Sequence, residues 1–164
     1  MSTEQPSGVD VQEGQIEKAN YEQIEEEKFS PGCKPKPIVI YAAARRLESV
    51  IAKQSLSTLE KEGLIEKGET TINYKRLRSF CNYYGDRGDA CRIVLLSNPI
   101  LRNKQGHPRS TANFLKNARK WGINVAVIGS SRDFEGFEGL EKIVPNSLSL
   151  TPEGLTEIIS RVYQ

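Results

Sequence analysis

The short run Ile38-Val39-Ile40-Tyr41 decides the fold of this chain of 164 residues. Its near-continuous hydrophobicity, its β-branched side chains and its short length are typical of a buried strand in a parallel sheet. Two similar runs follow at Ile93-Val94-Leu95-Leu96 and Val125-Ala126-Val127-Ile128, and Ile143-Val144 is a candidate start of another strand. The sequence therefore predicts three buried strands and a short fourth.

A helix is expected directly after the first of these strands. Residues 42–62 have Leu47, Val50 and Ile51 on one side, and Gly63 is a plausible stop. These positions predict one helix between the first strand and the polar segment that follows it.

The second predicted helix has the clearest periodicity. Leu77, Phe80, Cys81 and Tyr84 are spaced i, i+3, i+4 and i+7, which places them on one face of a helix. Gly85 stands where a left-handed residue commonly ends a helix. We therefore expect the helix to end near Gly85.

Two more helices are predicted after the second strand. Residues 110–121 form one, closed by Gly122, and Thr151-Pro152 opens the last with an N-cap and a first-turn proline. The last helix repeats the helical spacing at four apolar positions: Leu155, Ile158, Ile159 and Val162. Strands alternating with helices predict an α/β fold, a Rossmann-like three-layer sandwich with a small, mostly parallel sheet.

The N-terminal part has a different composition from the rest. Residues 1–30 carry eight acidic and two basic side chains, and few apolar residues recur at a useful period. Such a segment cannot bury enough surface to offset the entropy of ordering. We predict that residues 1–36 are a disordered acidic tail and that residues 37–164 form a single α/β domain.

Cysteine usage and hydropathy indicate the compartment. Cys33, Cys81 and Cys91 are too few for a disulfide framework and lack the CxxC spacing of metal sites. No signal peptide and no apolar run of about 18 residues is present. The expectation is an intracellular protein, cytoplasmic or nuclear, that is neither secreted nor bound to a membrane.

Basic charge gathers in the middle of the chain. Residues 75–120 carry eleven basic and two acidic side chains, interleaved with aromatic residues such as Tyr83 and Tyr84, and Trp121 follows directly. Phosphate contacts need Lys and Arg, and bases stack on aromatic rings. The candidate nucleic-acid-binding residues are Lys75, Arg76, Arg78, Arg102, Lys104, His107, Arg109, Lys116, Arg119 and Lys120. The acidic tail is then a candidate intramolecular competitor for this surface.

Whether the basic residues can bind a polyanion together depends on the fold. The basic clusters around Arg76, Arg109 and Arg119 are separated along the chain, and a single binding surface requires the fold to bring them to one face. If they point in three directions, the polyanion hypothesis fails.

Catalytic and nucleotide-binding motifs are incomplete. Ligands of open parallel sheets gather at the carboxyl ends of the strands, here residues 41–46, 97–101 and 129–134. Asp133 is the one acidic residue in these segments, although Glu48 on the first helix could join it. The sequence contains neither GxGxxG after the first strand nor GxxxxGK[ST]. We therefore assign no catalytic residue, metal ligand or cofactor, and the sequence favours a binding module over an enzyme.

Residues 38–128 resemble the NYN branch of PIN-type ribonucleases. The similar pieces are a strand, a helix, the segment Ile72-Asn73-Tyr74-Lys75-Arg76-Leu77, and then a strand, loop and helix. In that family an acidic residue follows the first strand, and further acids come later. This chain has Tyr41-Ala42-Ala43-Ala44 and Lys142-Ile143-Val144-Pro145-Asn146 instead. The resemblance implies RNA binding without the nuclease metal site.

Residues 92–162 resemble the later half of von Willebrand factor A-type domains. The similar pieces are residues 92–100, residues 122–129 and the closing helix, whereas the DxSxS motif of that family is absent. That resemblance implies a protein-binding adaptor in a large complex. The prediction is thus a non-catalytic module that binds RNA or another polyanion. The alternatives are a protein–protein adaptor and a metal-dependent ribonuclease, either degenerate or active through Asp133 and Glu48.

Overall fold

The computed structural model describes residues 35–98, 108–131 and 136–163. The chain divides into Met1–Pro35 and Lys36–Gln164, and the fold described below belongs to the second unit. The expected acidic tail, residues 1–36, lies almost wholly outside the described residues. The elements in chain order are β2 (Ile38–Ala42), α3 (Arg46–Lys61), β3 (Lys67–Thr71), α4 (Tyr74–Asp86), the 3-10 helix η1 (Ala90–Arg92), β4 (Ile93–Ser97), α5 (Pro108–Lys120), β5 (Asn124–Ile128), β6 (Glu141–Ile143) and α6 (Pro152–Val162).

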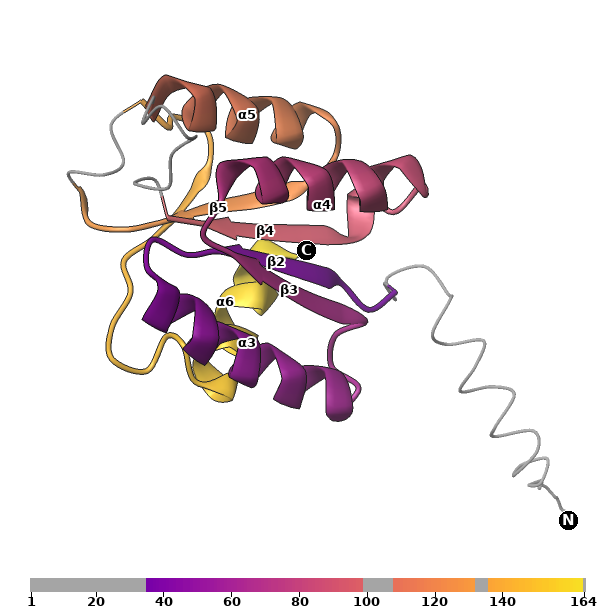
Figure 1. The fold of residues 1–164 in the computed structure, drawn as a ribbon, viewed down its shortest axis with the longest axis vertical. Helices are drawn as coiled ribbons and strands as arrows, with labels where there is room; N and C mark the ends of the chain where they lie inside the picture. The colour runs from indigo at the N-terminus through magenta and orange to yellow at the C-terminus, as the bar shows by residue number, and fades with distance from the viewer. Residues whose placement is uncertain (1–34, 99–107, 132–135, 164) are drawn as a thin grey trace, which may run out of the picture. The chain divides into compact units, whose positions relative to one another are not determined.

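The described strands form one five-stranded sheet in the order β3-β2-β4-β5-β6, and every neighbouring pair is parallel. Strand β2 pairs with β3 on one side and with β4 on the other (Figure 1). The chain thus leaves β2 in one direction and crosses back past it to build the rest of the sheet. This reversal makes the carboxyl ends of β2 and β4 the topological switch point. The α/β, Rossmann-like prediction is confirmed.

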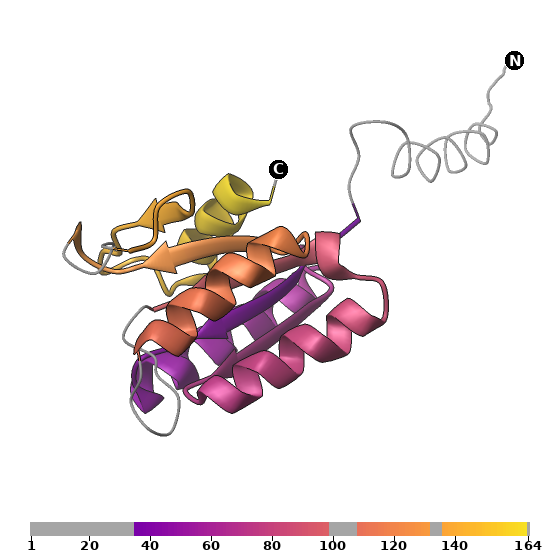
Figure 2. The same ribbon diagram turned by 90° about the horizontal axis from the view of Figure 1, so that it is seen from above.

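Helices cover the sheet on both faces, as three layers require. The alternation of side chains along β2 sends Ile38, Ile40 and Ala42 into the core under α4 and α5. Val39 and Tyr41 enter the opposite core, under α3 and α6. Figure 2 shows α4, in pink, and α5, in orange, running side by side across one face of the sheet.

The sequence-based prediction missed strand β3 because its residues, Lys-Gly-Glu-Thr-Thr, include no large apolar side chain. It is an edge strand, and α3 protects its outer edge: Glu60 accepts from the Gly68 amide, and Lys53 donates to the Gly68 carbonyl. A Cβ at Gly68 would lie 2.6 Å from the Leu56 Cβ. Glycine at this position therefore allows α3 to lie close to the strand.

The side of α3 that faces the core is not the one that carries Leu47, Val50 and Ile51. Its buried residues are Ala52, Ser55, Leu56 and Leu59. Leu47, Val50 and Ile51 are instead 70%, 47% and 39% exposed. The first half of α3 therefore carries a second apolar side that no described part of the chain covers.

Helix α3 begins at Arg46 and not at residue 42 as predicted, because Ala42 still belongs to strand β2. The carboxyl ends of the helices agree with the predictions apart from one glycine. Gly63 and Gly122 have positive φ angles of 76° and 99°, as expected after α3 and α5. Gly85 lies inside α4, and Gly88, with φ 84°, ends the helix instead. The amide of Asp89 donates to the Tyr84 carbonyl, which is the bond of a Schellman motif and requires the left-handed residue at Gly88.

No helix among the described residues combines the length and the apolar character needed to cross a bilayer.

Candidate functional site

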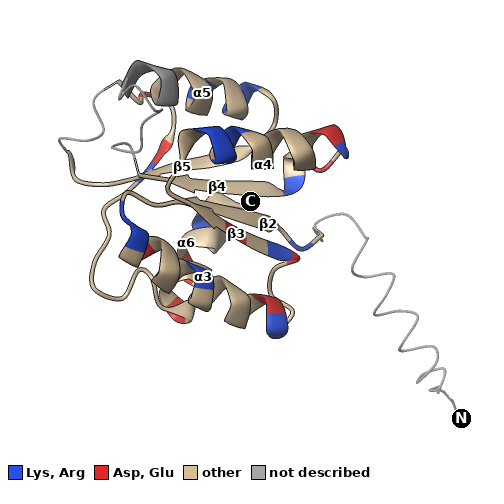
Figure 3. Ribbon diagram, in the orientation of Figure 1, with Lys and Arg blue, Asp and Glu red and all other residues tan. Residues whose placement is uncertain are grey.

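Charge is divided unevenly between the two helical layers. Helices α4 and α5 contain seven basic and one acidic residue, whereas α3 and α6 contain four of each. Because α4 and α5 pack on the same core, their basic residues belong to one layer of the molecule (Figure 3). We call this outer surface of α4 and α5 the basic layer.

The amino-terminal turns of α4 supply the first part of the basic layer. Asn73 caps the helix by accepting from the Arg76 amide at 3.0 Å. The Arg76 guanidinium lies 5.1 Å from the Phe80 ring centroid, and the Arg78 guanidinium lies 5.8 Å from that of Tyr74. These aromatic contacts hold the arginines while leaving their N–H donors open to other groups.

Basic side chains at this end of α4 oppose the helix dipole. Lys75 and Arg76 are in the first turn, Arg78 follows in the second, and the first turn has no acidic residue. Cations near a helix N-terminus are unfavourable by about 0.3–1 kcal/mol each at exposed sites. The arrangement is therefore not one that helix stability alone would select.

Aromatic rings join α4 to α5. Tyr74 packs edge to face on Phe114 with ring centroids 6.0 Å apart, and Phe114 packs in the same way on Trp121 at 5.9 Å. Phe114 is buried, whereas Trp121 is 55% exposed at the end of α5. Trp121 therefore offers a fixed, accessible ring beside the basic residues of α5, and Tyr83 on α4 is similarly exposed.

The structure describes six of the ten predicted binding side chains, and all six are on α4 or α5. They are Lys75, Arg76, Arg78, Lys116, Arg119 and Lys120. Arg109 belongs to the first turn of α5, but its side chain is not described. Arg102, Lys104 and His107 lie outside the described residues.

The six side chains share a layer, but they do not form one compact cluster. Arg76 is in the first turn of α4, which follows the carboxyl end of β3, whereas Arg119 is in the last turn of α5, which precedes β5. They therefore lie at opposite ends of the sheet. The polyanion hypothesis required Arg76, Arg109 and Arg119 to share one face. Arg76 and Arg119 belong to one helical layer, and the side chain of Arg109 is not described.

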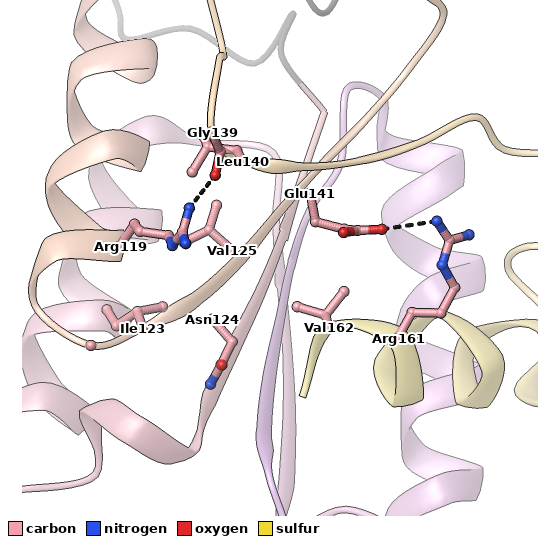
Figure 4. Close-up of a pocket in the computed structure, with 10 residues that line it drawn as sticks. Arg119, Ile123, Asn124, Val125, Gly139, Leu140, Glu141, Arg161 and Val162 are labelled. Carbon is pink, nitrogen blue, oxygen red and sulfur yellow. Dashed lines mark hydrogen bonds and ion pairs between the residues drawn. The ribbon is translucent and has the colours of Figure 1, made fainter. Parts of the chain in front are cut away.

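Arg119 points away from α4. Its guanidinium donates to the carbonyl of Gly139, beside β6 (Figure 4). Lys116, one turn earlier, lies on the same side: the pKa of the exposed Glu138 carboxyl is lowered, first by backbone hydrogen bonds and then by the charges of Lys116 and Lys142. The basic layer thus continues around α5 toward the β6 edge.

Arg119 also lines a polar cavity of about 550 Å³ at the amino ends of β5 and β6. Across this cavity, Arg161 of α6 pairs with Glu141 at 2.9 Å, as Figure 4 shows. The two guanidiniums come from opposite faces of the sheet. Sequence reasoning missed this cavity because its residues are far apart in the chain and match no motif.

The topological switch point is occupied by a structural network. The Glu48 carboxylate accepts from the Tyr41 hydroxyl and from the Ala44 amide, both at 3.2 Å. Burial, followed by the Glu48 charge and hydrogen bond, raises the pKa of the Tyr41 phenol well above its ordinary value. Glu48 therefore holds the loop after β2 in place, and Asp133, its proposed metal-binding companion, lies outside the described residues.

Neither a metal ion nor an anion gains support as a ligand at the described carboxyl ends of the strands. Among the described residues, no three His, Cys, Asp or Glu side chains are grouped so as to hold a metal ion. In the strand-end segment after β5, the Gly129 amide could donate to an anion, but it donates to the Ile143 carbonyl at 3.0 Å and extends the sheet.

Comparison of the chain with known protein families, with curated proteins and with solved structures finds no match. The resemblances to NYN/PIN-type and von Willebrand factor A-type domains therefore stay predictions.

Proposed function

We propose that this chain is a non-catalytic binding module that holds RNA or another polyanion on the basic layer of α4 and α5. The observation that carries the proposal is the seven-to-one ratio of basic to acidic residues on these two helices, against four-to-four on α3 and α6. A solvated helical surface of ordinary composition mixes both signs, and such a single-sign field attracts polyanions.

The absence of carboxylate partners supports the same proposal. Within residues 35–98, 108–131 and 136–163, no ion pair joins a carboxylate to any of the six described binding side chains. The charges of Lys75, Arg76, Arg78 and Lys120 are therefore available to phosphate groups, whereas Lys116 acts on Glu138 and Arg119 donates to the Gly139 carbonyl. Exposed Trp121 and Tyr83 add ring faces on which unpaired bases can stack, which favours single-stranded RNA over a duplex.

The placement of positive charge at the amino end of α4 is a further reason. Residues that weaken their own helix are expected where a site needs them. Lys75 and Arg76 fit this pattern, because they stand where an acidic residue would stabilise α4.

Salt dependence of RNA binding tests the proposal. Fluorescence anisotropy with a labelled single-stranded RNA should give a log affinity that falls linearly with log salt, by about 0.7 per phosphate contact. An affinity that does not respond to salt would contradict binding through the basic layer.

A matched pair of variants tests which helical layer binds the RNA. Lys120→Gln and Lys61→Gln each remove one charge from the last turn of a helix, but on opposite layers. Lys120→Gln should weaken RNA binding and reduce the salt slope by about 0.7, while Lys61→Gln leaves both unchanged. Equal effects of the two variants would show that only net charge matters.

A further inference from the structure

The outer side of α3 has an apolar surface that the proposed polyanion site does not use. Leu47, Val50 and Ile51 are spaced i, i+3 and i+4, so they form one continuous stripe on the helix. The side of α3 that faces the core is a different one, formed by Ala52, Ser55, Leu56 and Leu59. Clustered apolar side chains left in solvent mark interaction surfaces more often than isolated ones do.

A hollow lies beside this apolar stripe. Its volume is about 370 Å³, and its lining includes Leu47, Ile51 and Leu150 together with Arg45. The Ser55 hydroxyl donates to the Leu150 carbonyl, which fixes the loop before α6 against α3. The stripe and Leu150 thus form two apolar walls held by the fold, with room between them for side chains of a partner.

Two charged residues, Arg45 and Glu48, line the hollow, and Arg46 adjoins Arg45 at the start of α3. Arg45 and Arg46 are exposed at the start of α3, and neither has a carboxylate partner in the described part of the chain. Glu48, the nearest acidic residue along α3, is half-buried and engaged with Tyr41 and Ala44. Within the described residues, a ligand of this surface therefore meets two guanidiniums that pair with no carboxylate, next to an apolar stripe.

We propose that the apolar stripe of α3 and its hollow bind an acidic amphipathic helix of a partner protein. Apolar side chains of that helix enter the hollow between α3 and Leu150, and its Asp or Glu residues pair with Arg45 and Arg46. The spacing of the stripe suits the ridges of a second helix. This site is on the layer opposite to the basic layer, so it is independent of polyanion binding.

Charge distinguishes this partner from a second copy of the chain. Antiparallel pairing of two α3 helices about Val50 would set Arg46 of one copy beside Gln54 of the other. No carboxylate would then meet Arg45 or Arg46. The stripe therefore fits an acidic partner better than it fits itself.

Selection from a display library of random peptides, each on the order of four helical turns long, tests this proposal. The full chain is the bait, and the Leu47→Ser/Ile51→Ser variant is used for counter-selection. The enriched peptides should combine apolar residues spaced i, i+3 or i+4 with Asp and Glu. Failure to enrich peptides that distinguish the two baits, or enrichment of basic peptides, would overturn the proposal.

Variants of the full chain then locate the binding of the selected peptide. Arg45→Glu/Arg46→Glu should weaken it by a factor of about 10 or more, since two charge-assisted contacts are lost. Leu64→Ser is the matched control, because Leu64 is an exposed leucine just after α3 and outside the hollow. Full affinity in the arginine variant, or a loss in Leu64→Ser or Lys120→Gln, would place the peptide elsewhere and refute the site.

Sedimentation equilibrium of the full chain completes the test. A monomer is expected at micromolar concentration. A dimer that Leu47→Ser dissociates would show that a second copy covers the stripe and would overturn the assignment to an acidic partner.

Discussion

The ring of Tyr74, the first residue of α4, packs edge to face on Phe114 of α5 with centroids 6.0 Å apart. This contact joins two helices that are consecutive in the layer and together carry seven basic residues and one acidic residue. The spacing of the two basic helices therefore depends on an aromatic core that the charges themselves do not supply.

Phe114→Ala should lower the free energy of unfolding by about 3–5 kcal/mol, because it opens a cavity between α4, α5 and the sheet. Urea unfolding followed by circular dichroism measures the change. Trp121→Ala is the comparison, because Trp121 is half-exposed and its removal leaves no enclosed cavity. A loss below about 1 kcal/mol for Phe114→Ala would show that the two helices are not held by this ring.

Lys75→Glu should separate stability from binding. An acidic residue in the first turn of α4 favours the helix dipole, so the free energy of unfolding should rise by up to about 1 kcal/mol. RNA affinity should fall at the same time, because a phosphate contact becomes a repulsive charge. Thermal unfolding and anisotropy on the same sample measure both effects. If Lys75→Glu strengthens or preserves RNA binding, the start of α4 is not part of the site.

Removal of residues 1–30 tests the proposed competition by the acidic tail. The deletion removes eight acidic and two basic residues, so the remaining chain is more basic by six charges. Affinity for RNA at low salt should rise by a factor on the order of 3 to 10, and the difference should vanish at high salt. Unchanged affinity at low salt would exclude the competitor hypothesis.

The raised pKa values of two buried groups predict that the fold becomes less stable at alkaline pH. Burial raises the pKa of the Cys81 thiol to about 12, and burial with the Glu48 contact raises the pKa of the Tyr41 phenol above its ordinary value of 10.0. In the unfolded chain both groups lose their protons at lower pH than in the folded protein. The unfolded state then binds fewer protons, so the free energy of unfolding should fall as pH rises above about 9.

Tyr41→Phe isolates the phenol contribution. The variant has no proton to lose, so above pH 10 its stability should fall less steeply than that of the unmodified chain, by about 1.4 kcal/mol per pH unit. Chemical denaturation between pH 8 and about 11 gives both slopes. Parallel pH profiles for the two proteins would mean that Tyr41 titrates alike in the folded and unfolded states.

The sequence alone was sufficient for the buried strands and for the class of the fold. Ile38–Ala42, Ile93–Ser97 and Asn124–Ile128 are apolar because parallel strands covered on both faces exclude water from both sides. Helical spacing at Leu77, Cys81 and Tyr84 likewise identified the core side of α4. These features depend on local pattern, which a sequence displays directly.

Tertiary structure decided what local pattern could not. Strand β3 forms from polar residues because β2 supplies its hydrogen-bonding partner and α3 covers its edge at Gly68. The sheet order placed α4 and α5 on one face, which made a surface out of basic residues that the sequence shows only as a count. On α3, contact with the sheet selected Ala52, Leu56 and Leu59 and left Leu47, Val50 and Ile51 in solvent. Hydrophobic periodicity shows which residues of a helix lie together, but only packing against the rest of the fold decides which side is buried.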